Sequence, residues 1–121
     1  MDKKILIVED DDSIRNTCER MARTGGFSEA NIYLASSAEE ALEILGKQKF
    51  DFLLTDNNMS GITGLELIAQ CKEKFPSIKV ILMSGRLQQL KDNNKIPDGI
   101  WTIAKPFKVD EFCAIIKKAL A

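Results

Sequence analysis

Four short apolar runs, each ending in a few polar residues, constrain the fold of this chain more than any other feature. The runs cover residues 5–8, 52–55, 80–83 and 100–104, and they are followed by Glu9-Asp10-Asp11, Asp56-Asn57-Asn58, Ser84-Gly85 and Lys105-Pro106-Phe107. Short apolar runs bounded by turn residues are typical of buried parallel strands. Ligands of open α/β sheets gather outside the carboxyl ends of such strands. The sequence therefore predicts that these polar side chains meet at one edge of a sheet.

Together the polar run ends form a set suited to phosphoryl transfer. Their carboxylates can hold a divalent cation and offer a nucleophile, while a hydroxyl and an ammonium group can neutralise phosphoryl oxygens. Each residue also has a simpler interpretation when taken alone. Asp56 can cap a turn, and acids near position 10 can stabilise a helix N-terminus, which suits Asp11 and Asp12 better than Glu9 and Asp10.

Length and charge predict a small protein without a polyanionic partner. The 121 residues fit one domain covering positions 1–121, and 17 Lys+Arg against 18 Asp+Glu give a formal net charge of −1. No nucleic-acid or membrane partner is indicated by this balance. The apolar runs are far too short to span a membrane, and Met1-Asp2-Lys3-Lys4 leads directly into a strand without room for a signal peptide. We therefore expect a soluble cytoplasmic protein.

Cysteine and histidine usage narrows the chemistry further. Cys18, Cys71 and Cys113 are far apart and odd in number, which argues against a structural zinc site or a disulfide framework. The chain contains no histidine. Triads that need histidine and a role as a phosphohistidine carrier are therefore excluded.

Periodicity along the chain predicts alternating strands and helices. Expected strands cover residues 4–9, 31–35, 52–55, 78–83 and 100–104, and expected helices cover 12–24, a segment opening with a capping box at Ser37–Glu40, 63–74 and 109–120. Asp12 or Ser13 is expected to cap the first helix, whose apolar stripe begins at Ile14. Residues 86–98 allow only a turn or two of helix. This alternation indicates a parallel sheet with helices on both faces.

The same motifs resemble the receiver domain of two-component response regulators. The matching segments are Val8-Glu-Asp-Asp11, Thr55-Asp-Asn-Asn-Met-Ser-Gly61 with Gly64-Leu-Glu66, Met83-Ser-Gly85 and Lys105-Pro-Phe107. They stand in the family's order, at about its spacing, over essentially the whole chain. The resemblance implies a flavodoxin-like, doubly wound, five-stranded parallel sheet of order 2-1-3-4-5.

The resemblance also implies roles for individual residues. Asp56 would be the phosphoacceptor, attacking phosphorus in line to form an acyl phosphate. The implied Mg²⁺ ligands are Glu9, Asp10, Asp56 and the backbone carbonyl of Asn58. Lys105 would contact one phosphoryl oxygen, and Ser84 would donate its hydroxyl to another. A cis peptide bond between Lys105 and Pro106 is expected on the same grounds.

The implied function is a signalling switch. A sensor histidine kinase, a phosphotransfer protein or a small phosphodonor would phosphorylate Asp56, and a downstream target protein or output domain would respond. The domain would catalyse its own phosphorylation and dephosphorylation. The chain departs from the family pattern at Ser60, Thr63 and Gly85, and most consequentially at Thr102, where an aromatic residue is usual. Trp101 is expected to face the other side of the sheet.

Two other functions remain open from the sequence. One is a receiver-like module that binds proteins without using phosphate, which the complete set of site residues argues against. The other is a Mg²⁺-dependent phosphohydrolase of the haloacid dehalogenase type. Such enzymes place the nucleophile after the first strand with a second aspartate two residues on, whereas here Asp56 follows the third expected strand and Asn58 takes the second position.

Overall fold

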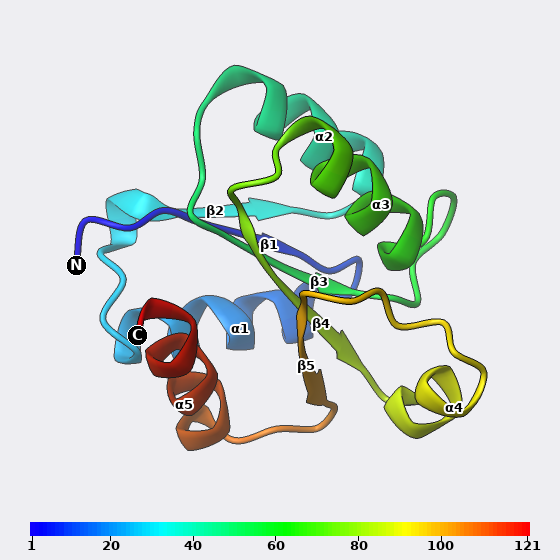
Figure 1. Ribbon diagram of the computed structural model, residues 1–121. Coiled ribbons are helices and arrows are strands. Elements are labelled where there is room, and N and C mark those ends of the chain that lie inside the picture. The colour runs from blue at the N-terminus through cyan, green and yellow to red at the C-terminus, as the bar shows by residue number, and fades with distance from the viewer.

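A five-stranded, entirely parallel sheet forms the centre of the computed structural model, which describes residues 1–121 (Figure 1). The strands are β1 (Ile5–Val8), β2 (Ile32–Ala35), β3 (Phe52–Asp56), β4 (Lys79–Ser84) and β5 (Trp101–Ala104). The helices are α1 (Asp12–Thr24), α2 (Ala38–Lys47), α3 (Gly64–Lys74), α4 (Leu87–Asp92) and α5 (Val109–Leu120), and a 3₁₀ turn (Glu29–Asn31) precedes β2. The strand order is β2-β1-β3-β4-β5, so the predicted fold is confirmed.

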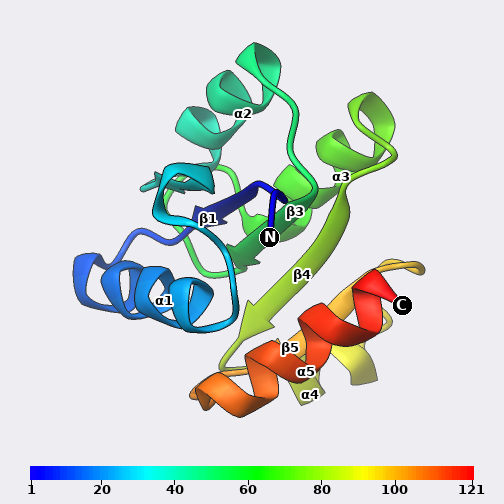
Figure 2. The same cartoon turned by 90° about the vertical axis from the view of Figure 1, so that its left-hand side faces the viewer.

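Helices cover both faces of the sheet, and each face has its own apolar core. Helices α1 and α5 lie on one face and α2 and α3 on the other (Figure 2). The side chains of β1 alternate between the two cores, Ile5 and Ile7 toward α1 and α5, Leu6 and Val8 toward α2 and α3. Every residue of β1 and β3 is buried. Continuous apolar runs in the sequence reflect this burial on both faces.

The register of the strands brings their carboxyl ends to one edge. Val8 of β1 is opposite Thr55 of β3, and Asp56 is opposite Met83 of β4. Ser84 is opposite Ala104 of β5. The polar residues that end or follow these strands are therefore placed close together, although almost 100 residues separate the first from the last.

The N-cap of α1 differs from the prediction. Asp11, not Asp12 or Ser13, is the cap, and its Oδ1 accepts a hydrogen bond from the backbone N of Ile14 at 2.9 Å. Asp11 has an extended backbone, with φ −82° and ψ 121°, whereas Asp12 is already helical and cannot take the capping conformation. The side of Ile14 was also predicted wrongly, because this residue is 36% exposed and not part of the buried stripe.

The capping box expected at the start of α2 is only half formed. Ser37 accepts a hydrogen bond from the backbone N of Glu40, but the Glu40 carboxylate accepts from the backbone N of Ser36. A complete reciprocal box is found instead at the start of α3, between Thr63 and Glu66.

The segment between β4 and β5 contains a short helix and an extended return. Helix α4 covers six residues and has no buried residue. In the return after α4, the carbonyl of Asp98 accepts a hydrogen bond from the Nζ of Lys72 of α3 at 2.9 Å.

On β5, Trp101 packs against the core on the α1 and α5 face, as predicted, and Thr102 is half-buried. None of the helices has the length and apolar character needed to cross a membrane.

Candidate functional site

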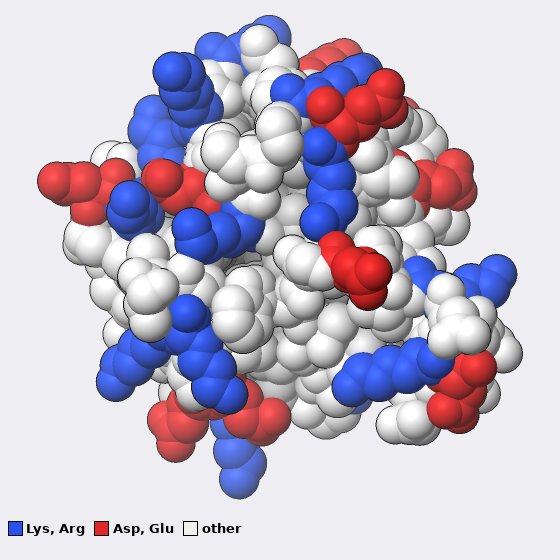
Figure 3. Space-filling model, viewed as in Figure 1, with Lys and Arg blue, Asp and Glu red and all other residues white.

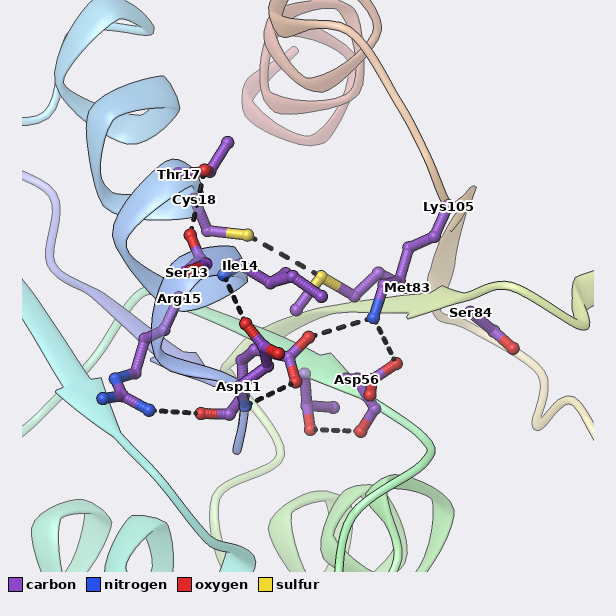
Figure 4. A network of polar contacts seen from close by, with 12 residues as sticks. Asp11, Ser13, Ile14, Arg15, Thr17, Cys18, Asp56, Met83, Ser84 and Lys105 are labelled. Atoms are coloured by element: carbon purple, nitrogen blue, oxygen red, sulfur yellow. Dashed lines mark hydrogen bonds and ion pairs between the residues drawn. The ribbon is translucent and has the colours of Figure 1, made fainter.

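Four strands deliver the predicted site residues to the carboxyl edge of the sheet. Glu9 follows β1, Asp56 ends β3, Ser84 ends β4 and Lys105 follows β5. Figure 4 shows the Lys105 amine directed toward the Asp56 carboxylate. The structure therefore brings Glu9, Asp56 and Lys105 into contact, as the sequence predicted, and places Ser84 at the end of the neighbouring strand β4.

Lys105 joins the two buried carboxylates of this edge. Its Nζ lies 3.0 Å from Glu9 Oε1 and 3.2 Å from Asp56 Oδ1. The side chain of Lys105 is 19% exposed, against 1% for Glu9 and 5% for Asp56. The peptide bond between Lys105 and Pro106 is cis, as expected. Glu9 is further held by the backbone N of Asp11, which donates to Oε2 at 3.2 Å.

Three carboxylates at this edge are close enough to share one cation. Each of Glu9, Asp10 and Asp56 offers an oxygen, and these oxygens lie within 4.8 Å of one another. Glu9 and Asp56 are buried, whereas Asp10 is exposed. Three negative charges face one ammonium group, so the site has an excess of negative charge. Closely spaced carboxylate oxygens are the ligands that hard divalent cations prefer, and this donor set fits such an ion.

Burial and ion pairing act in opposite directions on the site's pKa values. Burial raises the pKa of Glu9 and of Asp56, and the hydrogen bonds and charge of Lys105 oppose that rise. Burial alone would lower the pKa of Lys105, but hydrogen bonds and charges from the two carboxylates outweigh it and raise that pKa. Lys105 therefore stays protonated and positively charged in this position.

The backbone around Asp56 depends on Gly64, which the sequence comparison included in the segment Gly64-Leu-Glu66 without assigning it a structural role. A Cβ on Gly64, the first residue of α3, would lie 2.1 Å from the carbonyl oxygen of Asp56. Asn57 ties the same two segments together, since its Oδ1 accepts from the backbone N of Leu65 at 3.1 Å. Glycine is a poor helix former, so its place at the start of an apolar helix was the available signal.

Ser84 and Asn58 differ in their burial. Ser84 is buried, and its Oγ accepts a hydrogen bond from the backbone N of Arg86 at 3.0 Å. Asn58 is exposed in the loop after β3. A cavity of about 370 Å³ lies between this loop and α4, and Asn57, Ser84 and Arg86 are among the residues that line it.

Arg15 supports the site from α1. Its guanidinium donates to the carbonyl of Glu9 at 2.9 Å and pairs with Asp12. Nothing in the spacing of the sequence could have indicated the contact from Arg15 to a backbone carbonyl.

Next to α1, a second cavity of about 430 Å³ adjoins Lys105 and is lined by Ile14 and Met21, among others.

Comparison with known proteins identifies the family. The family model described as "Response regulator receiver domain" matches residues 5–117. The chain belongs to the response regulator receiver domains. Receiver domains are phosphorylation-activated signalling switches, and the resemblance found in the motifs is confirmed over almost the whole length.

The relatives of this chain differ in how much of their own length it covers. It is 30% identical to sporulation initiation phosphotransferase F of Bacillus subtilis over 122 residues, covering 99% of the chain and 95% of that protein. It is 33% identical over 116 residues to the DNA-binding transcriptional regulator NtrC of Klebsiella pneumoniae, covering 95% of the chain but 24% of that protein. Among solved structures, TrrA of Thermotoga maritima, in complex with Mg²⁺-BeF, superposes with a TM-score of 0.86, 27% identity and coverage of 97% and 98% of the two chains.

Proposed function

We propose that Asp56 is the phosphoacceptor of this receiver domain. The observation that carries the proposal is the position of Lys105, whose ammonium contacts both Asp56 and Glu9 at the carboxyl edge of the sheet. An ammonium group in this place favours the ionised form of the Asp56 carboxylate, against the effect of burial, and positions a positive charge where a phosphoryl oxygen would arrive.

In the proposed reaction, a carboxylate oxygen of Asp56 attacks phosphorus in line with the bond to the donor. The new bond from oxygen to phosphorus forms while the donor's bond to phosphorus breaks, and the leaving group departs with the electron pair and takes a proton from solvent. Lys105 stabilises the charge on a transferring oxygen. Attack of water on the resulting acyl phosphate would reverse the modification, so we propose that the domain catalyses both steps on itself.

The proposed residues for Mg²⁺ are Glu9, Asp10, Asp56 and the backbone carbonyl of Asn58. When bound, Mg²⁺ would supply positive charge to the phosphoryl oxygens. The excess of carboxylates over ammonium groups supports this assignment, as does the fit of three oxygen donors within 4.8 Å. The Mg²⁺-BeF complex of TrrA is a further argument from similarity.

Ser84 is proposed to report phosphorylation to the neighbouring segment. Its hydroxyl oxygen holds the backbone N of Arg86, directly before α4, and α4 has no fully buried residue, although its half-buried Leu90 packs against the core. A hydroxyl that turns to donate to a phosphoryl oxygen changes this contact. We expect phosphorylation to shift or order the backbone of residues 86–98, and unchanged amide spectra there on phosphorylation would contradict this.

The proposed partners follow from this chemistry. A sensor histidine kinase or phosphotransfer protein would present the phosphohistidine, and its approach is supported by the cavity beside Lys105 and by exposed Ile14 on α1. A downstream target protein or output domain would read the change near α4. We propose that residues 1–121 act as a single domain in the cytoplasm, without direct contact to nucleic acid or membrane.

A phosphorylation assay with intact-mass detection tests the proposal. The protein is incubated with acetyl phosphate in the presence of Mg²⁺, and the expected product carries one phosphoryl group. Asp56→Asn is expected to abolish the adduct, and omission of Mg²⁺ is expected to prevent it. Asp98→Asn serves as a matched control, because Asp98 is exposed and lies in the segment before β5. An adduct that persists in Asp56→Asn would refute the assignment.

A further inference from the structure

A groove opens at the opposite end of the sheet from Asp56. It has a volume of about 580 Å³ and lies where α2 and α3 end and where the chain enters β3 and β4. Its apolar lining includes Phe50, Phe75 and Ile78. Phe50 is buried, whereas Phe75 and Ile78 are half-buried, so part of this apolar surface remains open to a ligand.

Lysines surround this groove. Lys47, Lys49 and Lys74 line it, and all three are exposed. Three further lysines are at the same edge. The Nζ of Lys3 pairs with Asp51, the Nζ of Lys4 donates to Gln48, and the backbone N of Lys79 donates to the Asp51 carbonyl. Figure 3 shows blue side chains gathered at the upper left, over the region where α2 ends in Figure 1.

The lining of the groove contains three lysines and one acidic residue. Asp51 is the one acidic residue that lines the groove, and its carboxylate already accepts a hydrogen bond from the backbone N of Lys4 at 2.9 Å and pairs with Lys3. The net charge of the chain is −1, so a local excess of lysine here is balanced by acids elsewhere, including the carboxylates around Asp56. Such a separation favours an acidic partner at this edge.

We propose that this groove is a docking site for an acidic polypeptide segment that carries an apolar or aromatic anchor residue. Carboxylates of the segment would pair with the exposed lysines at the rim, and the anchor would occupy the apolar surface formed with Phe75 and Ile78. This site is independent of the proposed phosphoacceptor, because its residues lie before β3 and β4 and not after them.

The structure favours a peptide over other anions. Lys47 and Lys74 are the last residues of α2 and α3, so the partial negative charge of two helix C-termini faces the groove and disfavours a small bare anion inside it. The net charge of −1 weakens long-range attraction to a polyanion such as DNA or an anionic vesicle. A short acidic segment interacts only with the lysines within about 10 Å at ordinary ionic strength.

An NMR titration of the isotope-labelled protein tests the proposal. The probe is a ten-residue peptide of glutamates around one central phenylalanine, and the control peptide has glutamines in place of the glutamates. We expect saturable shifts of the amides of residues 45–51, 74, 75 and 77–79, and we expect added salt to weaken the binding. The variant that combines Lys49→Glu with Lys74→Glu should bind about tenfold more weakly, the effect of losing two exposed ion pairs and adding repulsion. Lys117→Glu with Lys118→Glu, two exposed lysines at the end of α5, is the matched control.

The outcomes of these measurements distinguish an acidic peptide from other ligands that could occupy the groove. Equal binding of the glutamine peptide, or no shift in the groove residues at millimolar peptide, would overturn the proposal. Tighter binding to phosphatidylglycerol vesicles or to a DNA oligomer than to the peptide would also overturn it. Circular dichroism melts check that the variants fold. If the double glutamate variant is unfolded, Lys49→Gln with Lys74→Gln replaces it, and unchanged affinity of that variant would count against the site.

Discussion

Replacing Lys105 by methionine removes the cation that contacts both buried carboxylates, while a side chain of similar length remains. The ammonium lies 3.0 Å from Glu9 and 3.2 Å from Asp56, whose side chains are almost fully buried. Breaking a buried ion pair by removing one partner costs about 3–5 kcal/mol, because the remaining charge is left unpaired. Uptake of a proton by a carboxyl group offsets part of this cost. We therefore expect the free energy of unfolding to fall by about 3 kcal/mol at neutral pH without Mg²⁺.

The loss should become smaller as the pH falls. Burial already raises the pKa of Glu9 and of Asp56, and removal of the amine, which opposes that rise, raises both further. A carboxyl group with a higher pKa in the folded than in the unfolded state binds more protons when folded. Its stabilising contribution is complete below the unfolded pKa of about 4 and is lost as the pH rises through the folded pKa. The variant should therefore recover stability relative to the wild type as the pH falls from neutral toward about 4, the unfolded pKa of a carboxyl group.

Urea unfolding at several pH values, with and without Mg²⁺, measures these effects. Mg²⁺ is expected to stabilise the variant more than the wild type, because it would no longer compete with the amine for the carboxylates. Lys117→Met, an exposed lysine on α5, controls for the loss of one positive charge. A loss below about 1 kcal/mol at neutral pH, the range of an exposed pair, would refute the reasoning. A loss that does not change with pH would refute it as well.

Three further effects follow from the structure. Gly64→Ala should destabilise the protein by several kcal/mol in urea unfolding, since its Cβ would lie 2.1 Å from the Asp56 carbonyl oxygen and the backbone would have to move. Asp11→Ala should lower stability by about 1 kcal/mol in thermal unfolding, because the N-cap of α1 is lost. Cys18 and Cys71 should react with a thiol reagent more slowly than the third cysteine, as burial raises the pKa of both thiols to about 11.

The fold was predictable because burial on both faces leaves a direct trace in the sequence. Strands β1 and β3 are buried at every position, and their apolar runs end where polar residues begin. The polar run ends therefore located the edge of the sheet at which Glu9, Asp56 and Lys105 meet. Helices α1 and α5 were predicted with their observed bounds, since both have strongly periodic apolar positions.

Contacts that depend on backbone geometry were not predictable in the same way. Three consecutive aspartates, Asp10 to Asp12, stand at the start of α1, and only the conformation of Asp11 decides which of them is the cap. The hydrogen bond from Arg15 to the carbonyl of Glu9 requires the turn between β1 and α1 to be in place. The approach of Gly64 to Asp56 likewise arises from the loop after β3, whose path periodicity does not determine.

The register of β5 bears on how a change at the site would reach α4. Trp101 is opposite Ile81 and packs into the core on the α1 and α5 face, while Thr102, opposite Leu82, points to the other face. A threonine has no large ring that could swing between an exposed and a buried position. The link that remains on this side is the Ser84 hydroxyl, which holds the backbone N of Arg86 at the start of an α4 with no buried residue. We therefore propose that a change at the site reaches α4 through the backbone rather than through an aromatic side chain on β5.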